Sequence, residues 1–326
     1  MKSMKQVTNV VMMIRPSRFR CNEQTAVNNY FQTPDSAGAV DDTTVTASAQ
    51  TEFDAFTSKL IDNGIRVLTV QDDDKFDTPD SVFPNNWISF HQRPHSAACD
   101  DNTIDINIYP MYAVNRRHEK NLLNSISSAL KSEFGLTVKV SNDFSSFEDS
   151  DKFLEGTGSL VLDRTHAIAY CAISPRAHPD LLDKFCTEMR YTPVPFTAYQ
   201  TVKDERVPIY HTNVMMCVGD TFAIICLDCI DDKAERNAVE NSLTSTGKEV
   251  IAITEEQIYH FAGNMLQLQS SEKNFVLVMS SEAFSSLTPD QKHRIEAHCP
   301  ILHAPLPVIE GTGGGSARCM MAEVFF

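Results

Sequence analysis

The sequence predicts a repetitive α/β assembly in which strands form an inner ring and helices an outer one. One module recurs along the chain: a small or polar loop, a short apolar strand, a turn and a second apolar strand. Amphipathic helical patterns alternate with these strand pairs, and no linker-like segment divides them, so residues 1–326 are expected to form one domain. The copies begin at Pro84, Glu155, His211, Gly263 and Gly311.

The strands are predicted from short apolar runs bounded by turn residues. Residues 10–14 form the first run, which Arg15 and Pro16 end. Gly219-Asp220 and Asp163-Arg164 separate paired runs and are typical of tight antiparallel connections. Residues 320–326 are mostly apolar and predict a buried final strand. Residues 33–50, rich in Thr, Ser, Ala and Asp, are expected to form a flexible surface loop.

The helices are predicted from apolar residues at helical spacing and from capping signals. Thr254 with Gln257, and Thr288 with Gln291, form Thr-x-x-Gln capping boxes, and Pro289 stands at the first helical position of the second. Three earlier amphipathic helices are expected from three apolar sets: Phe53, Phe56, Leu60 and Ile61; Leu122, Leu123, Ile126, Ala129 and Leu130; Leu181, Leu182, Phe185 and Met189.

Composition excludes several classes of protein. A formal net charge of -15 argues against binding to nucleic acid or to an anionic membrane surface. The first apolar run is too short for a signal peptide or a membrane span. Nine cysteines, an odd number without a zinc-type pair of pairs, predict free thiols, a reducing cytoplasm and no metal site. Cys226 and Cys229 have two-residue spacing, but a metal or redox role is the minor alternative.

The last module contains the sequence GGGSARCMM, which presents Cys319 directly after a triple glycine. Glycines allow backbone angles and close approaches that a Cβ would forbid, so Cys319 is a candidate nucleophile on a tight loop. The alternative is a glycine turn followed by a core cysteine, since cysteine is among the most buried residue types.

Equivalent loops of other modules also carry polar residues, namely Asn85 and Asn86, then Glu155, then His211 and Asn213. If the modules surround one axis, these loops converge at one end of it. A thiol needs a base or a cationic neighbour to become a thiolate, and an imidazole can later activate water. Taken singly, His211 would be read as a core or turn histidine and Glu155 as a solvated turn residue. Their shared place in the module favours a nucleophilic site.

The motifs VFPNNW, EGTGS, HTN and GGGSARCM, in this order, resemble those of the pentein superfamily of guanidino-group-modifying enzymes. That superfamily includes arginine deiminases, dimethylarginine dimethylaminohydrolases and amidinotransferases. The resemblance covers nearly the whole chain and implies a five-bladed β/α propeller with the site at its centre. It also implies Cys319 as nucleophile, His211 as general acid/base and Glu155 as the carboxylate that orients the histidine and a substrate nitrogen, with no metal or cofactor.

Two departures from that pattern bear on the substrate. Guanidinium-using members usually have aspartates where this chain has Asn86 and Asn213. An asparagine amide supplies no charge but can donate to a carbonyl oxygen, so a neutral ureido amino acid such as citrulline is favoured over arginine. This resembles the citrulline-utilising hydrolase branch. Asp80 keeps arginine-type substrates open, and Arg176, Arg15 and Arg318 are candidates to bind a substrate carboxylate.

Alternatives remain at this point. An arginine deiminase, a dimethylarginine hydrolase or an amidinotransferase would share the fold and the Cys-His-Glu set, and only substrate turnover separates them. A non-catalytic binding protein of the same fold is the alternative of another class. Trp87 is either a wall of the pocket or a core residue. The sequence leaves open which C–N bond is cleaved and whether the chain forms a homodimer.

Overall fold

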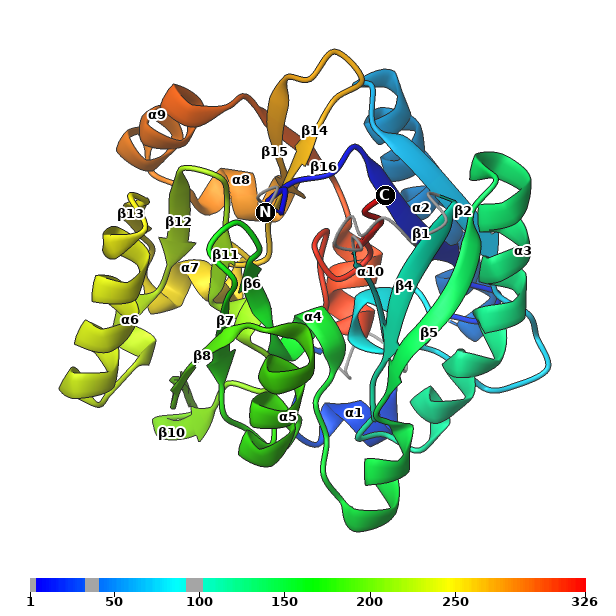
Figure 1. Ribbon diagram of the computed structural model, residues 1–326, viewed down its shortest axis with the longest axis horizontal. Helices are drawn as coiled ribbons and strands as arrows, with labels where there is room; N and C mark the ends of the chain where they lie inside the picture. The colour runs from blue at the N-terminus through cyan, green and yellow to red at the C-terminus, as the bar shows by residue number, and fades with distance from the viewer. Residues whose placement is uncertain (1–3, 33–40, 92–101) are drawn as a thin grey trace.

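The computed structural model describes residues 4–32, 41–91 and 102–326 and has a mixed α/β fold. Within these residues the strands form five three-stranded sheets and one two-stranded hairpin. Figure 1 shows the sheets around a common centre, with the C-terminal segment near it and helices on the outside. Contacts join neighbouring sheets through β17 and β3, β6 and β11, and β11 and β14.

The five sheets share one internal order, in which the inner strand is antiparallel to the middle strand and the outer strand is parallel to it. Written from inner to outer strand, the sheets are β17 (Ala322–Glu323), β1 (Val10–Arg15) and β2 (Arg66–Gln71); β3 (Ile88–His91), β4 (Thr103–Ile108) and β5 (Thr137–Asp143); β6 (Val161–Asp163), β7 (Ile168–Ala172) and β8 (Thr192–Phe196); β11 (Met216–Val218), β12 (Phe222–Ile225) and β13 (Glu249–Ala252); β14 (Leu266–Gln269), β15 (Phe275–Ser280) and β16 (Ile301–Ala304).

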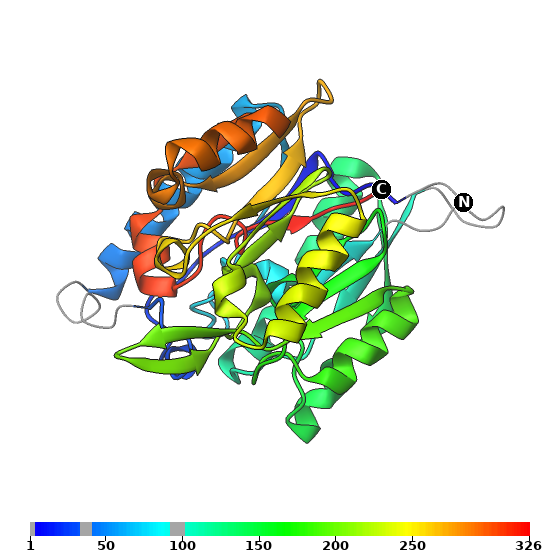
Figure 2. The same ribbon diagram turned by 90° about the vertical axis from the view of Figure 1, so that its left-hand side faces the viewer.

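A helix connects the middle strand of each sheet to its parallel outer strand, as parallel pairing requires. These connecting helices are α2 (Asp42–Asp62), α3 (Leu123–Phe134), α5 (Pro179–Met189), α6 (Lys233–Ser245), and α8 (Ser281–Ser286) with α9 (Pro289–His298). Figure 2 shows them on the outer side of the sheets. The remaining segments are α1 (Glu23–Ala26), α7 (Glu255–Tyr259), the hairpin β9 (Tyr199–Val202) and β10 (Glu205–Pro208), and the 3-10 helices η3 (Asn115–Leu122), η4 (Ser145–Ser150) and η6 (Leu227–Cys229).

The helix signals of the sequence are confirmed. Both Thr-x-x-Gln capping boxes form, at the start of α7 and α9, and Pro289 begins α9. Asp41 and Asp232 cap α2 and α6 by accepting backbone N–H bonds. Helix α2 buries Phe53, Phe56 and Leu60, but the exposed fraction of Ile61 is 55%, so Ile61 does not belong to the buried stripe.

Two sequence predictions need correction. Residues 42–50 are not loop but the first part of α2, and residues 33–40 lie outside the described residues. The expected final strand over 320–326 is reduced to β17, because Met320 and Met321 are buried in a turn. Of the two readings of Trp87, the core reading is confirmed, because Trp87 is fully buried within an apolar cluster.

The described cysteines agree with the sequence prediction of free thiols. Every described cysteine is a free thiol, and Cys99 lies outside the described residues. Cys226 and Cys229 are buried with their sulfur atoms 3.2 Å apart. None of the helices in the described ranges has the length and hydropathy needed to cross a membrane.

Candidate active site

The predicted polar loops come together in front of the inner strands. The 3-10 helix η2 (Pro84–Asn86) precedes β3, α4 (Gly156–Ser159) precedes β6, and η5 (Thr212–Val214) precedes β11. Helix α4 packs against both η2 and η5. The helix α10 (Pro307–Gly313) and the segment after it place Cys319 beside η5, where Asn213 Nδ2 lies 3.4 Å from Cys319 Sγ.

Glycines in the EGTGS motif allow this close approach. Gly156 has φ +45°, and a Cβ there would lie 2.3 Å from the carbonyl oxygen of Asn85. A Cβ on Gly158 would lie 2.4 Å from Asn86 Nδ2 and 2.8 Å from His211 Nδ1. Both side-chain nitrogens therefore lie close to Gly158, on the side where a Cβ would project.

His211 and Glu155 form a buried pair in which His211 Nε2 lies 2.7 Å from Glu155 Oε2. Burial lowers the pKa of His211 to about 4, although the bond to Glu155 opposes this shift. Burial alone would raise the pKa of Glu155, but Arg176 and His211 together lower it to about 2. At neutral pH the pair is a carboxylate and a neutral imidazole, with the proton on Nε2 and Nδ1 left as the base.

The other oxygen of Glu155 accepts from the backbone N–H of Tyr112 at 2.9 Å, which fixes the carboxylate plane. Arg176 Nη1 lies 3.5 Å from Glu155 Oε2, and the guanidinium stacks over the rings of Tyr210 and Tyr112. Its Nε and Nη2 groups donate to Asn28 Oδ1, and Nη2 also donates to the carbonyl oxygen of Thr25. Of the three arginines suggested as carboxylate binders, Arg176 alone lies at this pair.

The other two suggested arginines lie elsewhere. Arg15 forms an ion pair with Asp54 on the exposed side of α2. Arg318 turns its side chain away from the Glu155–His211 pair and donates to the carbonyl oxygen of Met321 and to Glu323. Both guanidinium groups are paired away from the Glu155–His211 pair, so neither is placed to bind a substrate carboxylate there.

The segment before Cys319 is held tightly by its glycines. Gly314 has φ +64° and caps α10, and a Cβ on Gly315 would lie 2.8 Å from the ring of Phe83. The N–H of Cys319 donates to the carbonyl oxygen of Ser316 at 3.0 Å, and Ser316 Oγ donates to Glu310 at 2.6 Å. Cys319 is buried at the edge of an apolar cluster, yet its sulfur faces amide nitrogens.

Asn86 is held by a buried arginine. Arg116 Nη1 donates to Asn86 Oδ1 at 2.7 Å, and Asn86 Nδ2 donates to Asn85 Oδ1 at 3.1 Å. Arg116 is anchored by a bidentate pair with Glu119, at 2.7 and 3.0 Å. Since the arginine can only donate, it fixes the oxygen of the Asn86 amide on its own side and leaves Nδ2 as a donor on the side of Gly158.

Asp80 lies on the other side of Arg116, with its Oδ2 at 3.8 Å from Arg116 Nε. The same oxygen accepts from Asn22 Nδ2 at 2.7 Å and from Thr25 Oγ1 at 3.2 Å. In the described part of the chain, buried atoms without a hydrogen-bond partner include Asp80 Oδ1, Asn85 Nδ2 and Asn213 Oδ1 near these loops, and Trp87 Nε1 directly after η2. Such atoms are costly unless a ligand or water pairs with them.

Sequence reasoning missed Arg116, Glu119 and Asn264. Arg116 and Glu119 lie in η3, whose sequence NRRHEKNL reads as a solvated charged segment, and only the contact with η2 explains their burial. Asn264 donates to Cys319 Sγ at 3.1 Å. The signal for Asn264 was available, because Gly263 begins one of the repeated modules.

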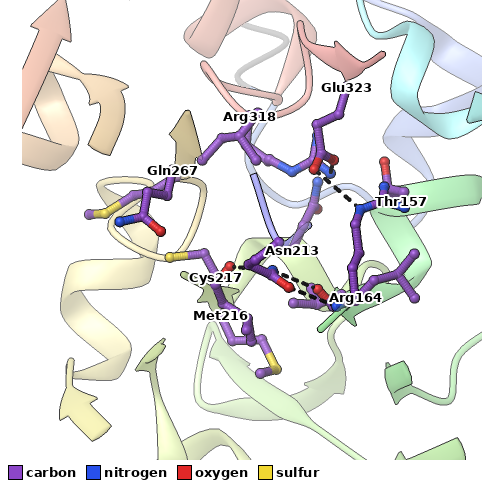
Figure 3. A pocket seen from close by; sticks show the side chains of 14 residues that line it. Thr157, Arg164, Asn213, Met216, Cys217, Gln267, Arg318 and Glu323 are labelled. Carbon is purple, nitrogen blue, oxygen red and sulfur yellow. Dashed lines mark hydrogen bonds and ion pairs between the residues drawn. The ribbon is translucent and has the colours of Figure 1, made fainter. Parts of the chain in front are cut away.

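Asn213 also borders a small cavity of about 30 Å³. Thr157, Arg164, Arg318 and Glu323 are among its other lining residues (Figure 3). The described residues contain no group of three or more His, Cys, Asp or Glu side chains with the geometry of a metal site. The expectation of a metal-free reaction stays a prediction.

Known proteins resemble the chain in sequence and in fold. The family described as N,N dimethylarginine dimethylhydrolase, eukaryotic, matches residues 15–326. A search of curated proteins found no match. The cyanobacterial arginine dihydrolase ArgZ is similar with 15% identity and a TM-score of 0.70, and the match covers 97% of this chain and 40% of ArgZ.

Shorter solved chains are matched over their whole length. The N-terminal domain of ArgZ, solved with substrate, has a TM-score of 0.67 at 15% identity, with 97% of both chains covered. A dimethylarginine dimethylaminohydrolase has a TM-score of 0.58 at 12% identity, with 97% of this chain and 99% of that chain covered. This chain belongs to the eukaryotic N,N dimethylarginine dimethylhydrolase family of the pentein superfamily of guanidino-group-modifying enzymes.

Proposed function

We propose that this protein hydrolyses the ureido group of citrulline or a close ureido amino acid through a covalent intermediate on Cys319. The net reaction converts citrulline and water into ornithine, ammonia and carbon dioxide. The observation that carries the proposal is the amide of Asn86, whose oxygen is held by Arg116 and whose nitrogen faces the space beside His211 Nδ1. A carbonyl oxygen needs such a donor, whereas a guanidinium offers only N–H groups.

The charges around the site support a neutral reacting group. Glu155 is balanced by Arg176, and Arg116 lies between Glu119 and Asp80. By the resemblance, Asn86 and Asn213 stand where guanidinium-using members usually have carboxylates, and asparagines add no charge. A buried guanidinium would therefore gain fewer charge-assisted contacts here than in those relatives.

The atoms without partners complement a ureido amino acid. Asn85 Nδ2 is a free donor for an oxygen, and Asn213 Oδ1 is a free acceptor for an N–H group. Asp80 Oδ1 is a free anionic acceptor, suited to the ammonium of an amino acid. A second candidate substrate, arginine, is supported by the same Asp80 oxygen and by the arginine dihydrolase activity of ArgZ.

In the proposed mechanism Cys319 loses its proton to His211 Nδ1, and the thiolate attacks the ureido carbon to give a tetrahedral adduct. The imidazolium, held by Glu155, returns that proton to the departing nitrogen. His211 is then neutral again and deprotonates a water that attacks the covalent intermediate. Cleavage of the C–S bond and loss of carbon dioxide from the resulting carbamic acid complete the reaction.

Two further observations support the proposal. The solved dimethylarginine dimethylaminohydrolase is an adduct with S-methyl-L-thiocitrulline, a ligand of the same general shape. Five sheets share one strand order, and contacts join three neighbouring pairs of them, which supports a five-bladed β/α propeller whose loops would converge on this site.

The test is mass-spectrometric product analysis with ammonia detection, on the wild-type protein and a Cys319→Ala control, with citrulline and arginine supplied separately. The proposal expects ornithine and ammonia from citrulline, and neither from the control. Citrulline formed from arginine, with no turnover of citrulline itself, would reject the ureido proposal in favour of a deiminase.

A further inference from the structure

The module that begins at Gly263 had no role in the site predicted from sequence, although its loop lies at the equivalent position. We propose that Asn264 in this loop is a catalytic residue that holds the Cys319 sulfur and stabilises it as a thiolate by N–H donation. This inference rests on the proposed function only in taking Cys319 as the nucleophile.

Asn264 contacts the nucleophile residue at two points. Its Nδ2 donates to Cys319 Sγ at 3.1 Å, and its Oδ1 accepts from the backbone N–H groups of Arg318 at 3.0 Å and Cys319 at 3.4 Å. The exposed fraction of Asn264 is 2%, so water does not compete for these bonds. Asn264 thus fixes both the backbone and the sulfur of Cys319.

The orientation of the Asn264 amide is determined by its surroundings. Its Nδ2 also donates to the carbonyl oxygen of Asn213 at 3.1 Å. Rotating the amide by 180° would place its oxygen against that carbonyl and its NH2 against two N–H donors, which removes its bonds to all three backbone groups. The group that faces the sulfur is therefore a donor.

Gly263 makes this placement possible. A Cβ on Gly263 would lie 2.2 Å from the carbonyl oxygen of Val214 and 2.8 Å from the Cα of Met215. Only glycine lets the loop approach the start of β11 so closely, and this approach brings Asn264 against Asn213 and Cys319. Gly263 thus allows the close approach, and Asn264 makes the contacts.

Two amide donors converge on one sulfur, since Asn213 Nδ2 lies 3.4 Å from it. Hydrogen bonds to the charged form of a group favour that form. The adjacent Arg318 does not supply this stabilisation, because its guanidinium binds Met321 and Glu323. Two other ionisable side chains lie near Cys319 and are paired elsewhere. His211 is neutral and paired with Glu155, and the Tyr210 hydroxyl donates to the carbonyl oxygen of Gly314 at 3.0 Å.

The experiment measures the alkylation rate of Cys319 by iodoacetamide at pH 7 without substrate, by quantifying the Cys319 peptide in the wild type, Asn264→Asp and Asn264→Ala. We expect at least a tenfold lower rate for Asn264→Asp, which puts an anion beside the sulfur, and at least a threefold lower rate for Asn264→Ala. The matched control is Asn274→Asp, which adds the same charge at the exposed turn of the same sheet and is expected to stay within twofold.

A purely structural role has a different signature. It would lower the melting temperature of the variants but leave the ultraviolet thiolate absorbance, measured as the difference from a Cys319→Ser protein, unchanged. A folded Asn264→Asp protein with the wild-type alkylation rate and thiolate absorbance would overturn the proposal. If Asn264→Asp does not fold, an unchanged alkylation rate and an unchanged thiolate absorbance in Asn264→Ala would also overturn the proposal. Because no substrate is used, this result is independent of whether citrulline is turned over.

Discussion

Replacing Asn86 by aspartate tests the basis of the proposed substrate preference. The variant should fold, because Arg116 Nη1 lies 2.7 Å from the Asn86 oxygen that both side chains share, and this contact becomes an ion pair. Asn85 has an unpartnered Nδ2 among the described residues and can turn its amide to donate to the new carboxylate. The fold is kept, but the donor that faces the reacting group is lost.

The expected loss has two parts. One neutral hydrogen bond to the ureido oxygen contributes about 1 kcal/mol, and an oxygen left facing a buried acceptor costs about 2 kcal/mol more. Together these amount to about 3 kcal/mol, or roughly a 100-fold decrease in kcat/KM for citrulline. For arginine the new carboxylate adds a charge-assisted contact, so its kcat/KM should rise or stay unchanged.

The assay determines kcat/KM for citrulline and for arginine in the wild type, in Asn86→Asp and in Asn124→Asp, an isosteric control on the exposed face of α3. The ratio of the two constants should shift by at least 100-fold toward arginine in Asn86→Asp alone. An Asn86→Asp protein that keeps its citrulline kcat/KM within threefold of the wild type would refute the reasoning.

Three other predictions concern the Glu155–His211 pair, Gly158 and the buried Glu310 of α10. With a His211 pKa of about 4, wild-type kcat/KM should stay level from pH 7 to about 5 and fall near pH 4. Glu155→Gln removes the interactions that raise the pKa of His211, so the decrease of kcat/KM should move to lower pH and kcat should drop about 100-fold. A decrease of kcat/KM near pH 6.5 in either protein would contradict this prediction. Gly158→Ala should lose at least 30-fold in kcat/KM with an unchanged circular dichroism spectrum, because its Cβ would lie 2.4 Å from Asn86 Nδ2; wild-type kinetics would show that this space is not used. Burial raises the pKa of Glu310 from 4.5 to about 7, so its contribution to stability is present below pH 4.5 and is lost as pH rises through 7. In urea unfolding, the free energy of unfolding of the wild type should therefore decrease by on the order of 2–3 kcal/mol between pH 5 and 8, and that of Glu310→Gln should not. The same pH dependence of this free energy in both proteins would argue against a raised pKa of Glu310.

Much of the fold is readable because each module carries its own signals. Alternating apolar runs, the Gly219-Asp220 turn and the two capping boxes are local features, and the structure has the strands and helices that they predict. The errors lie where local pattern is not decisive. The apolar residues after Cys319 are buried by a turn rather than by a strand, and polar residues 42–50 begin the long helix α2.

The site is readable in part because module equivalence places the loops of Asn86, Glu155, His211 and Cys319 together. Arg116 could not be found this way, because its burial depends on the oxygen of a side chain 30 residues earlier in the sequence. The amide orientation of Asn86 depends on the same contact. Sequence gives the residue type, but only the packed structure shows which end of the amide faces the site.

The most direct test of the account follows the ureido carbon itself. Citrulline labelled with carbon-13 at that carbon is mixed with the enzyme, quenched with acid at a series of times within the first turnover and analysed by peptide mass spectrometry. The account predicts the label on the Cys319 peptide at early times and in carbon dioxide later, with unlabelled ornithine. Label that reaches carbon dioxide without ever residing on Cys319, or citrulline that remains intact while arginine labels Cys319, would contradict it.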